Sequence, residues 1–146
     1  MTRTSELANI DWTRAHQWPL RVYYEDTDAG GVVFYANYLK FMERARTEWL
    51  RSLGVQQQEL AESLGLGFVV SQLDIKYLSA AKLDDSLIVQ TTITQAGRAS
   101  LHFAQRVIRL AQTLAEGHIR VGCVNLRTMR PTALPPEIHR QLVQSD

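Results

Sequence analysis

The pattern of the sequence changes from strand to helix within residues 23–38, YYEDTDAGGVVFYANY. The stretch begins as an aromatic run typical of a strand, and two carboxylates and the pair Gly30-Gly31 interrupt it. A long helical pattern then begins at Ala36. A helix N-terminus carries partial positive charge and free backbone N–H groups, which can hold a carboxylate or an oxyanion. The stretch is therefore the leading candidate for an active site.

Asp28 is the side chain of this stretch that is best suited to catalysis. The small residues Ala29, Gly30 and Gly31 follow it and would let a substrate approach the backbone closely. The alternative is structural, because a turn Asp accepts hydrogen bonds from the amides that follow it. Asp26 has the same two interpretations. On an extended segment its side chain would point to the same side as that of Asp28, which would allow a paired general acid and base.

Tyr35 lies directly before the expected helix. Its phenol or its backbone N–H could donate to a carbonyl oxygen, and the alternative is a ring that packs on the helix. Asn37 is better placed to cap the helix than to take part in chemistry.

The elements on either side of this stretch follow from apolar periodicity. Residues 18–25 predict a strand, and residues 36–53 predict a helix whose apolar positions recur at spacings of three and four. Gly54 stands where a glycine commonly ends a helix. Residues 57–64 predict a second, short helix.

The second half of the chain is rich in β-branched and aromatic residues and predicts a meander of long antiparallel strands. The expected strands cover residues 68–77, 86–95, 100–110 and 114–126. Three prolines within 131–136 end the sheet, and residues 137–144 predict a terminal helix. One strand, one long helix and four strands favour an α+β fold in which the sheet wraps the helix. The sheet edges that remain favour pairing with a second copy.

Composition narrows the class of protein. The chain has 146 residues, 45% of them hydrophobic, which suits one ordinary domain over residues 18–146 after a loosely ordered segment 1–17. Sixteen basic and fifteen acidic residues give a net charge of +1, so general nucleic-acid binding is not expected. No run approaches the ~20 apolar residues of a membrane span, and residues 1–17 lack a signal-peptide core. A cytoplasmic protein is therefore expected.

Metal and nucleophile motifs are weak in this chain. Cys123 is the one cysteine, which argues against a disulfide framework and a Cys-rich zinc site and favours a buried structural thiol. The four histidines are scattered without a ligand spacing, so no metal or cofactor is expected. Arg98 and Ser100, at the tip between two strands, could meet phosphates of a ligand, although such residues are more often solvated.

At this point the residues indicate a family. Residues 26–38, followed by 41–48, resemble the YbgC-type acyl-CoA thioesterases, which are associated with the Tol-Pal envelope system and belong to the wider 4-hydroxybenzoyl-CoA thioesterase-like group. Residues 83–85, 97–101 and 133–135 are similar to the family further along. The resemblance implies a hotdog fold, a curved antiparallel sheet around one long helix. It also implies dimers, often paired into tetramers, with sites at subunit interfaces.

The resemblance implies hydrolysis of acyl-CoA to CoA and a free acid, without a cofactor. Asp28 matches the catalytic carboxylate, as nucleophile or general base. Amides around Phe34–Ala36 would polarise the thioester carbonyl, and Arg98 and Ser100 match the CoA-contacting turn. The substrate-binding positions carried over are Gly30, Gly31, Val33, Phe34, Ala36, Arg98 and Ser100.

One position departs from the family pattern. Many YbgC-type members have a histidine where this chain has Tyr35, so any proton-transfer role of that histidine does not carry over. A tyrosine here is similar to the 4-hydroxybenzoyl-CoA branch, and it keeps Tyr35 among the catalytic candidates. Two alternatives stay open, a thioesterase that acts on acyl carrier protein and a non-catalytic acyl-ligand binding protein.

Overall fold

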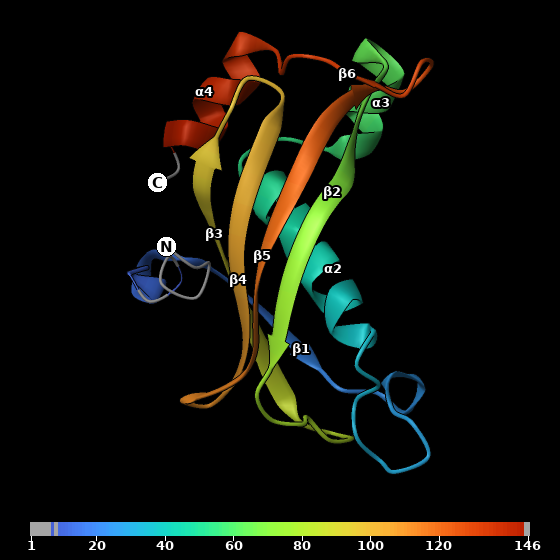
Figure 1. The fold of residues 1–146 in the computed structure, drawn as a ribbon, viewed down its shortest axis with the longest axis vertical. Coiled ribbons are helices and arrows are strands. Elements are labelled where there is room, and N and C mark those ends of the chain that lie inside the picture. Colours follow the sequence, from blue (N-terminus) through green and yellow to red (C-terminus); the bar gives the residue numbers. More distant parts are fainter. Residues whose placement is uncertain (1–6, 8, 145–146) are drawn as a thin grey trace.

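The computed structural model describes residues 7 and 9–144 of the chain (Figure 1). Two 3-10 helices, η1 (Trp12–Arg14) and η2 (Tyr24–Asp26), flank the first strand. The helices are α2 (Asn37–Ser52), α3 (Gln57–Leu64) and α4 (Pro136–Gln144). The strands are β1 (His16–Arg21), β2 (Leu66–Tyr77), β3 (Ser86–Ala96), β4 (Ser100–Arg109), β5 (Gln112–Asn125) and the short β6 (Arg130–Pro131).

The helices lie where the periodicity predicts them. The long helix was expected over 36–53 and runs from Asn37 to Ser52, and the short helix 57–64 matches α3. Gly54 follows α2 with a φ of +83°, as a helix-ending glycine does. The apolar face of α2 is buried by its contacts with the sheet, and its buried apolar members are Tyr38, Phe41, Met42, Ala45, Trp49 and Leu50.

The first strand is displaced from its predicted range 18–25. β1 begins at His16, inside the segment 1–17, and pairs with β3 from there. It ends at Arg21, because residues 24–26 turn into η2 instead of continuing the strand. The rest of the segment expected to be loosely ordered lies partly outside the described residues.

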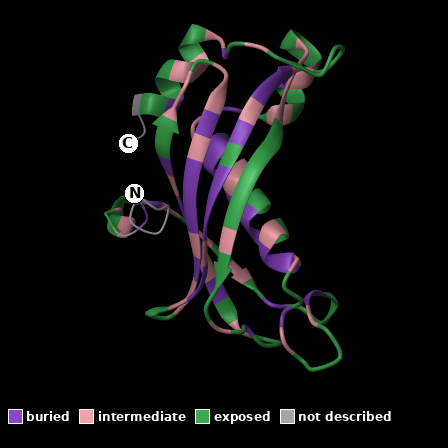
Figure 2. Cartoon of the chain, viewed as in Figure 1, coloured by how far each residue is buried: buried purple, intermediate pink, exposed green. Residues whose placement is uncertain are grey.

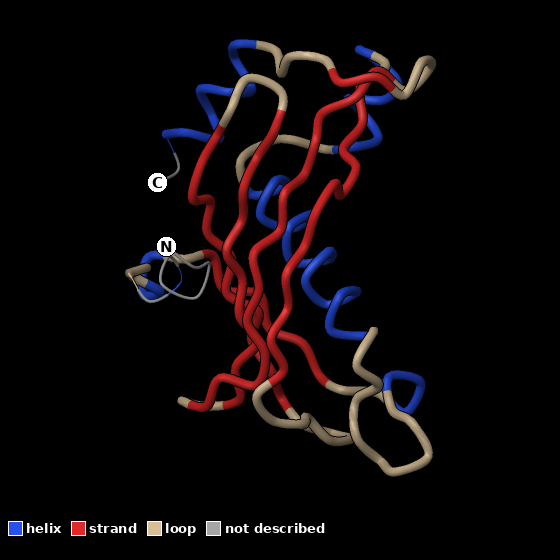
Figure 3. Tube along the Cα trace, viewed as in Figure 1, coloured by secondary structure: helices blue, strands red, loops and turns tan. Residues whose placement is uncertain are grey.

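The strands form one antiparallel sheet that curves around α2 (Figures 1 and 3). The strand order is β1-β3-β4-β5-β2, with β6 beside β5. This confirms the α+β architecture of a sheet wrapped around one helix. The buried core lies between them and includes Phe103 and Leu101 of β4 and Ile119 of β5.

The expected meander is wrong in one respect. β3, β4 and β5 do follow one another across the sheet, but β2 pairs with β5 and not with β3. The chain therefore passes from β2 at one edge to β3 near the other through residues 78–85. Strands adjacent in sequence often pair, but a connection of this length allows them to separate.

The sheet has two distinct ends. At one end, residues 22–36 and 78–85 lie together, because Val22 donates to Asp85 O at 2.9 Å and Val33 donates to Ala81 O at 2.8 Å. At the other end lie the turn 97–99 and helix α4 (Figure 1). The eleven residues of β3 join the two ends. A strand rises about 3.3 Å per residue, so the ends are roughly 30 Å apart.

Strand β2 forms an edge of the sheet with an apolar, exposed surface. Its only strand partner in the described chain is β5, and Figure 2 shows it largely exposed beside the buried β4 and β5. Exposed apolar side chains on β2 and just beyond it are Val69, Val70, Leu73, Tyr77 and Leu78. An unpaired edge that carries such side chains is a ready partner for another strand.

Candidate active site

Asp28 lies at the tip of a loop that is closed by an isolated β-bridge between Thr27 and Val33. Its backbone N–H donates to Val32 O at 2.9 Å, and its carbonyl oxygen accepts from Gly31 N at 3.1 Å. Gly31 has a φ of +79°, a conformation that a side chain would strain. The turn therefore depends on this glycine, and it leaves the Asp28 side chain exposed.

The Asp28 carboxylate is oriented by its own turn. Its Oδ1 accepts a hydrogen bond from Gly30 N at 2.8 Å, while Oδ2 accepts none from the described residues. A Cβ on Gly30 would lie 3.3 Å from Oδ1, closer than side chains normally approach. Glycine at this position lets the backbone hold one carboxylate oxygen and leaves the other open to a reactant.

Asp26 does not form a pair with Asp28, and the expectation of an extended segment is wrong here. Asp26 ends the 3-10 turn η2 and is buried. Its Oδ2 accepts from Tyr23 N at 2.9 Å and its Oδ1 from Asn37 Nδ2 at 3.0 Å. Asp26 therefore anchors the loop to the first residue of α2. Asn37 uses its side chain for this contact, so the expectation that it caps the helix is also wrong.

The start of α2 presents two free backbone N–H groups. Phe34 N is occupied, because it donates to Asp26 O at 3.0 Å. Neither Tyr35 N nor Ala36 N has an acceptor within residues 7 and 9–144. Free N–H groups at a helix start form a site for an anion or a developing oxyanion. Two of the three expected amides are thus available, and the third serves the loop.

Tyr35 keeps its ring outside the core, with 63% of the residue exposed. The ring packs against Phe34, with centroids 4.8 Å apart, and meets Tyr77 edge-on. The Tyr77 hydroxyl donates to Tyr35 O at 3.1 Å, and this bond fixes the peptide group that joins Tyr35 to Ala36. Partial burial, together with the neighbouring phenols of Tyr35 and Tyr38, raises the pKa of Tyr77, so this donor keeps its proton at neutral pH.

Val33 faces inward and not toward an open surface. Its side chain belongs to the buried core, and its N–H is bound to Ala81 O. Of the positions expected to bind substrate, Val33 therefore supports the loop from beneath, whereas Gly30, Gly31 and Phe34 are exposed.

Arg98 and Ser100 lie at the other end of the sheet, far from Asp28 in the same chain. The turn is compact, since Gly97 N donates to Ser100 O at 2.8 Å, and Leu134 N donates to Arg98 O at 2.9 Å. The second contact brings the segment before α4 against the turn. The structure therefore does not bring the two sets of expected site residues together in one protomer.

The sequence reasoning missed two basic residues beside Arg98. His139 and Arg140 of α4 line the same depression, with Gly97 and Leu134. His139 Nε2 lies 3.4 Å from Ala96 O, which places α4 on the end of β3. The basic residues of the terminal helix were a signal in the sequence, but only the fold shows that they adjoin Arg98.

A cavity of about 90 Å³ lies between α2 and the concave face of the sheet, with apolar side chains on the sheet side and the polar Glu43, Thr47 and Gln57 on the helix side. Its lining includes Leu50 of α2, Phe68 and Val70 of β2, and Phe103 of β4, with Arg46 at one wall. Arg46 donates to Gln105 Oε1 at 3.0 Å, and burial lowers the pKa of Arg46 to about 10. No pattern in the sequence marks this cavity, because its walls come from five separate elements, α2, α3, β2, β4 and β5.

Three further features of the described residues concern metal ligands, the cysteine thiol and membrane-spanning helices. No group of three His, Cys, Asp or Glu side chains is arranged there to hold a metal ion. Cys123 is buried, as expected, and burial raises the pKa of its thiol. Among these residues no helix combines the length and apolar character that crossing a bilayer requires.

Comparisons with known proteins agree with these features. Residues 22–142 match the model of the thioesterase-like superfamily. The chain is 51% identical over 121 residues to the acyl-CoA thioesterase YbgC of Haemophilus influenzae, covering 83% of this chain and 89% of the relative. It is 46% identical over 133 residues to the acyl-CoA thioester hydrolase YbgC of Escherichia coli, covering 90% and 98%.

Solved structures show the same architecture. A probable thioesterase from Bartonella henselae superimposes with a TM-score of 0.80 at 32% identity, over 83% of this chain and 99% of the other. The expected hotdog fold is thereby confirmed.

Proposed function

The chain belongs to the thioesterase-like superfamily, among the YbgC acyl-CoA thioesterases, and from this premise we propose that it hydrolyses acyl-CoA to CoA and a free carboxylic acid. One observation carries the proposal. The loop that presents the Asp28 carboxylate leads into a helix start where Tyr35 N and Ala36 N are free. A carboxylate on a loop that leads into free N–H donors supplies the two kinds of group that acyl transfer uses, a nucleophile or base and donors for the oxyanion.

In the proposed reaction, the thioester carbonyl oxygen accepts hydrogen bonds from Tyr35 N and Ala36 N. These donors stabilise the negative charge that develops on this oxygen, and they need no reorganisation because α2 fixes them. Asp28 Oδ2 attacks the carbonyl carbon, the C–S bond breaks, and the thiolate of CoA leaves and takes a proton from solvent. Water then hydrolyses the mixed anhydride and regenerates the carboxylate. In the alternative route Asp28 takes a proton from the water that attacks.

Tyr35 contributes through its backbone in this proposal. Tyr77 holds its carbonyl, and Phe34 packs on its ring, so the following N–H of Ala36 is fixed in direction. The phenol is exposed and replaces the family histidine without taking over proton transfer. Tyr35→Phe should therefore retain most of the activity of the unmodified enzyme.

We propose a homodimer, because a second copy could bring the Asp28 end and the Arg98 end of the sheet together. Antiparallel pairing of β2 with the same strand of a second copy reverses the partner's sheet. The partner subunit's Arg98 would then lie at the end that holds Asp28. The exposed apolar edge of β2 supports this pairing. We propose that the basic depression of one subunit binds the CoA phosphates while the loop of the other cleaves the thioester.

The cavity between α2 and the sheet supports binding of an acyl group, because its sheet side is apolar. The apolar side chains on its sheet side, such as Phe68 and Phe103, would contact the hydrocarbon. Val70, at its exposed rim, can be enlarged without disturbing the core. Val70→Phe should lower kcat/KM for the longer members of an acyl-CoA series more than for the shortest.

The test is release of CoA by the purified protein over short, long and aromatic acyl-CoAs. Asp28→Asn should lower kcat about 10³-fold or more, because the amide is neither nucleophile nor base at this position. Glu25→Gln, which removes an exposed carboxylate three residues earlier, is the matched control and should leave kcat unchanged. Near-normal turnover by Asp28→Asn would contradict the assignment. Faster release from acyl carrier protein at equal acyl length would identify that carrier instead.

A further inference from the structure

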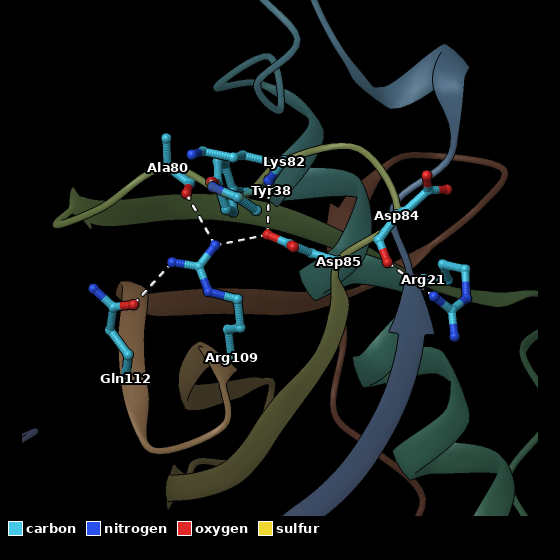
Figure 4. Close-up of polar contacts among 9 residues, drawn as sticks. Arg21, Tyr38, Ala80, Lys82, Asp84, Asp85, Arg109 and Gln112 are labelled. Atoms are coloured by element: carbon cyan, nitrogen blue, oxygen red, sulfur yellow. Dashed lines mark hydrogen bonds and ion pairs between the residues drawn. The ribbon is translucent and has the colours of Figure 1, made fainter.

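Arg109, the last residue of β4, fastens the connection between β2 and β3 (Figure 4). Its Nη1 lies 2.6 Å from Asp85 Oδ2 and donates to Ala80 O at 3.3 Å. Its Nη2 donates to Gln112 Oε1 at 2.8 Å, which orients the guanidinium. One cation thus holds both ends of residues 80–85 to the sheet.

Asp85 links this ion pair to the backbone of the turn 82–85. Its Oδ2 also accepts from Lys82 N at 2.9 Å, which closes the turn 82–85 from inside. Burial alone would raise the pKa of Asp85, but the Lys82 amide and the Arg109 guanidinium together hold it below the usual range. The carboxylate is therefore ionised at neutral pH and binds both partners as a charged acceptor.

The same short segment contacts both the Asp28 loop and the start of α2. Toward the Asp28 loop, Ala81 O accepts from Val33 N at 2.8 Å, and Val32 forms a bridge with Lys82. Toward the helix start, Ala81 N donates to the Tyr38 hydroxyl at 3.0 Å. The buried Tyr38 lies in the first turn of α2, directly after the free amides. Residues 81 and 82 are thus a common support for the carboxylate and for its oxyanion donors.

We propose that Asp85 and Arg109 are positioning residues of the thioesterase reaction. They fix residues 80–82, and through them the direction in which Asp28 faces the N–H groups of Tyr35 and Ala36. This inference rests on the proposed function, since it assigns a role relative to that site. Neither residue belongs to the groups proposed to contact the substrate, so both would act on kcat through the geometry of those groups.

A comparison of the losses in rate and in stability separates this role from simple stabilisation of the fold. The Asp85 and Arg109 side chains are 23% and 26% exposed. The pair is therefore only partly exposed, and we expect its loss to lower Tm without unfolding the protein. Small displacements of reacting groups, in contrast, lower rates steeply, by up to about 10² for 1 Å. A positioning role therefore predicts a loss of rate that exceeds the loss of stability.

The experiment compares Asp85→Asn, Arg109→Gln and the double variant in the full-length protein. Each single variant should lower kcat about 10-fold or more and change KM less than about 2-fold, because the nucleotide binds at the other end. The double variant should be no slower than the slower single variant, since the two residues act as one unit. Arg109→Lys, which keeps a positive charge beside Asp85 but not the full set of donors, should be less impaired in kcat than Arg109→Gln.

Arg51→Gln is the matched control. It breaks an exposed ion pair with Glu48 on α2, with atoms 3.5 Å apart, and should leave kcat and KM unchanged. Unchanged kcat in Asp85→Asn and Arg109→Gln, alongside an inactive Asp28→Asn, would overturn the positioning role and keep the thioesterase site. An additive double variant, or a loss confined to Tm, would also overturn it. An active Asp28→Asn would instead defeat the proposed function. If Arg109→Gln does not fold, Asp85→Asn and Arg109→Lys decide.

Discussion

The two ends of the sheet differ in how they are built and in the charge they carry. At the Asp28 end, backbone hydrogen bonds tie the loop, the helix start and residues 80–85 together. At the α4 end, Arg98, His139 and Arg140 line an open depression. A rigid carboxylate site suits bond cleavage, whereas an open basic surface suits phosphates. In the proposed function, chemistry and nucleotide binding would therefore lie roughly 30 Å apart in one chain, about the length of β3.

If two copies share each site as proposed, the largest effect should come from separating them. Leu73→Glu places a charge on the exposed apolar edge of β2. It should abolish dimers and lower kcat/KM about 10²-fold or more, since each substrate would lose one half of its site. Analytical ultracentrifugation, together with CoA release over a dilution series, measures both effects. A fully active monomer would show that the two ends work independently.

A smaller loss should follow from crowding the carboxylate end alone. In Gly30→Ala the new Cβ would meet Asp28 Oδ1 at 3.3 Å and push the carboxylate aside. We expect kcat to fall about 5- to 10-fold with KM nearly constant, because only the reacting group moves. Steady-state kinetics tests this, with Ala29→Ser as the control at the neighbouring exposed position. A rise in KM with constant kcat would place substrate binding, and not chemistry, at this loop.

The opposite kinetic pattern should follow from neutralising the basic end. Arg98→Gln combined with Arg140→Gln removes two cations from the depression, so KM should rise about 10-fold while kcat changes little. The effect should shrink at high salt, which already screens exposed charges. A dephospho-CoA thioester should show a weaker dependence on these residues. Equal losses with and without the 3′-phosphate would remove the nucleotide from this surface.

The smallest effect concerns His16, which pairs with Thr91 midway between the two ends. Burial lowers the pKa of His16, opposed in part by Glu48, and its buried Nδ1 has no hydrogen-bond partner in the described chain. The folded state therefore favours the neutral ring. Stability should be retained above the ordinary pKa of about 6.5 and fall as pH drops through the lowered value. Thermal unfolding of His16→Gln across pH 4.5–8 should show a shallower slope, with kcat and KM unchanged; an equal slope would contradict this origin.

The sequence predicts those features that depend on neighbouring residues. Apolar spacing locates α2 and α3, and β-rich runs locate the strands, because both signals are local. The pairing of β2 with β5 could not be predicted in this way, since strand order depends on how distant segments pack. Periodicity also could not show that β1 starts at His16, where the pattern is weak.

The same distinction between local and long-range structure applies to the candidate site. Asp28 and its glycine turn are readable in the sequence, because a turn is a local structure. Which amides remain free depends on Asp26 O, which binds Phe34 N and leaves Tyr35 N open. The contact of Arg109 with Asp85 joins residues that are 24 positions apart. Only the fold brings such residues together.

The most direct test of the divided site mixes a protein that lacks the Asp28 carboxylate with a protein whose basic depression is neutralised. Chains carrying Asp28→Asn and chains carrying Arg98→Gln with Arg140→Gln are co-expressed with different tags, and the mixed dimer is purified. If Asp28 of one subunit works with Arg98 of the partner subunit, the mixed dimer holds one intact site. It should then show about half the kcat/KM of the unmodified dimer, measured below KM. If each chain supplied both ends of its own site, the mixed dimer would be no more active than the average of its two parents, and the account would be contradicted.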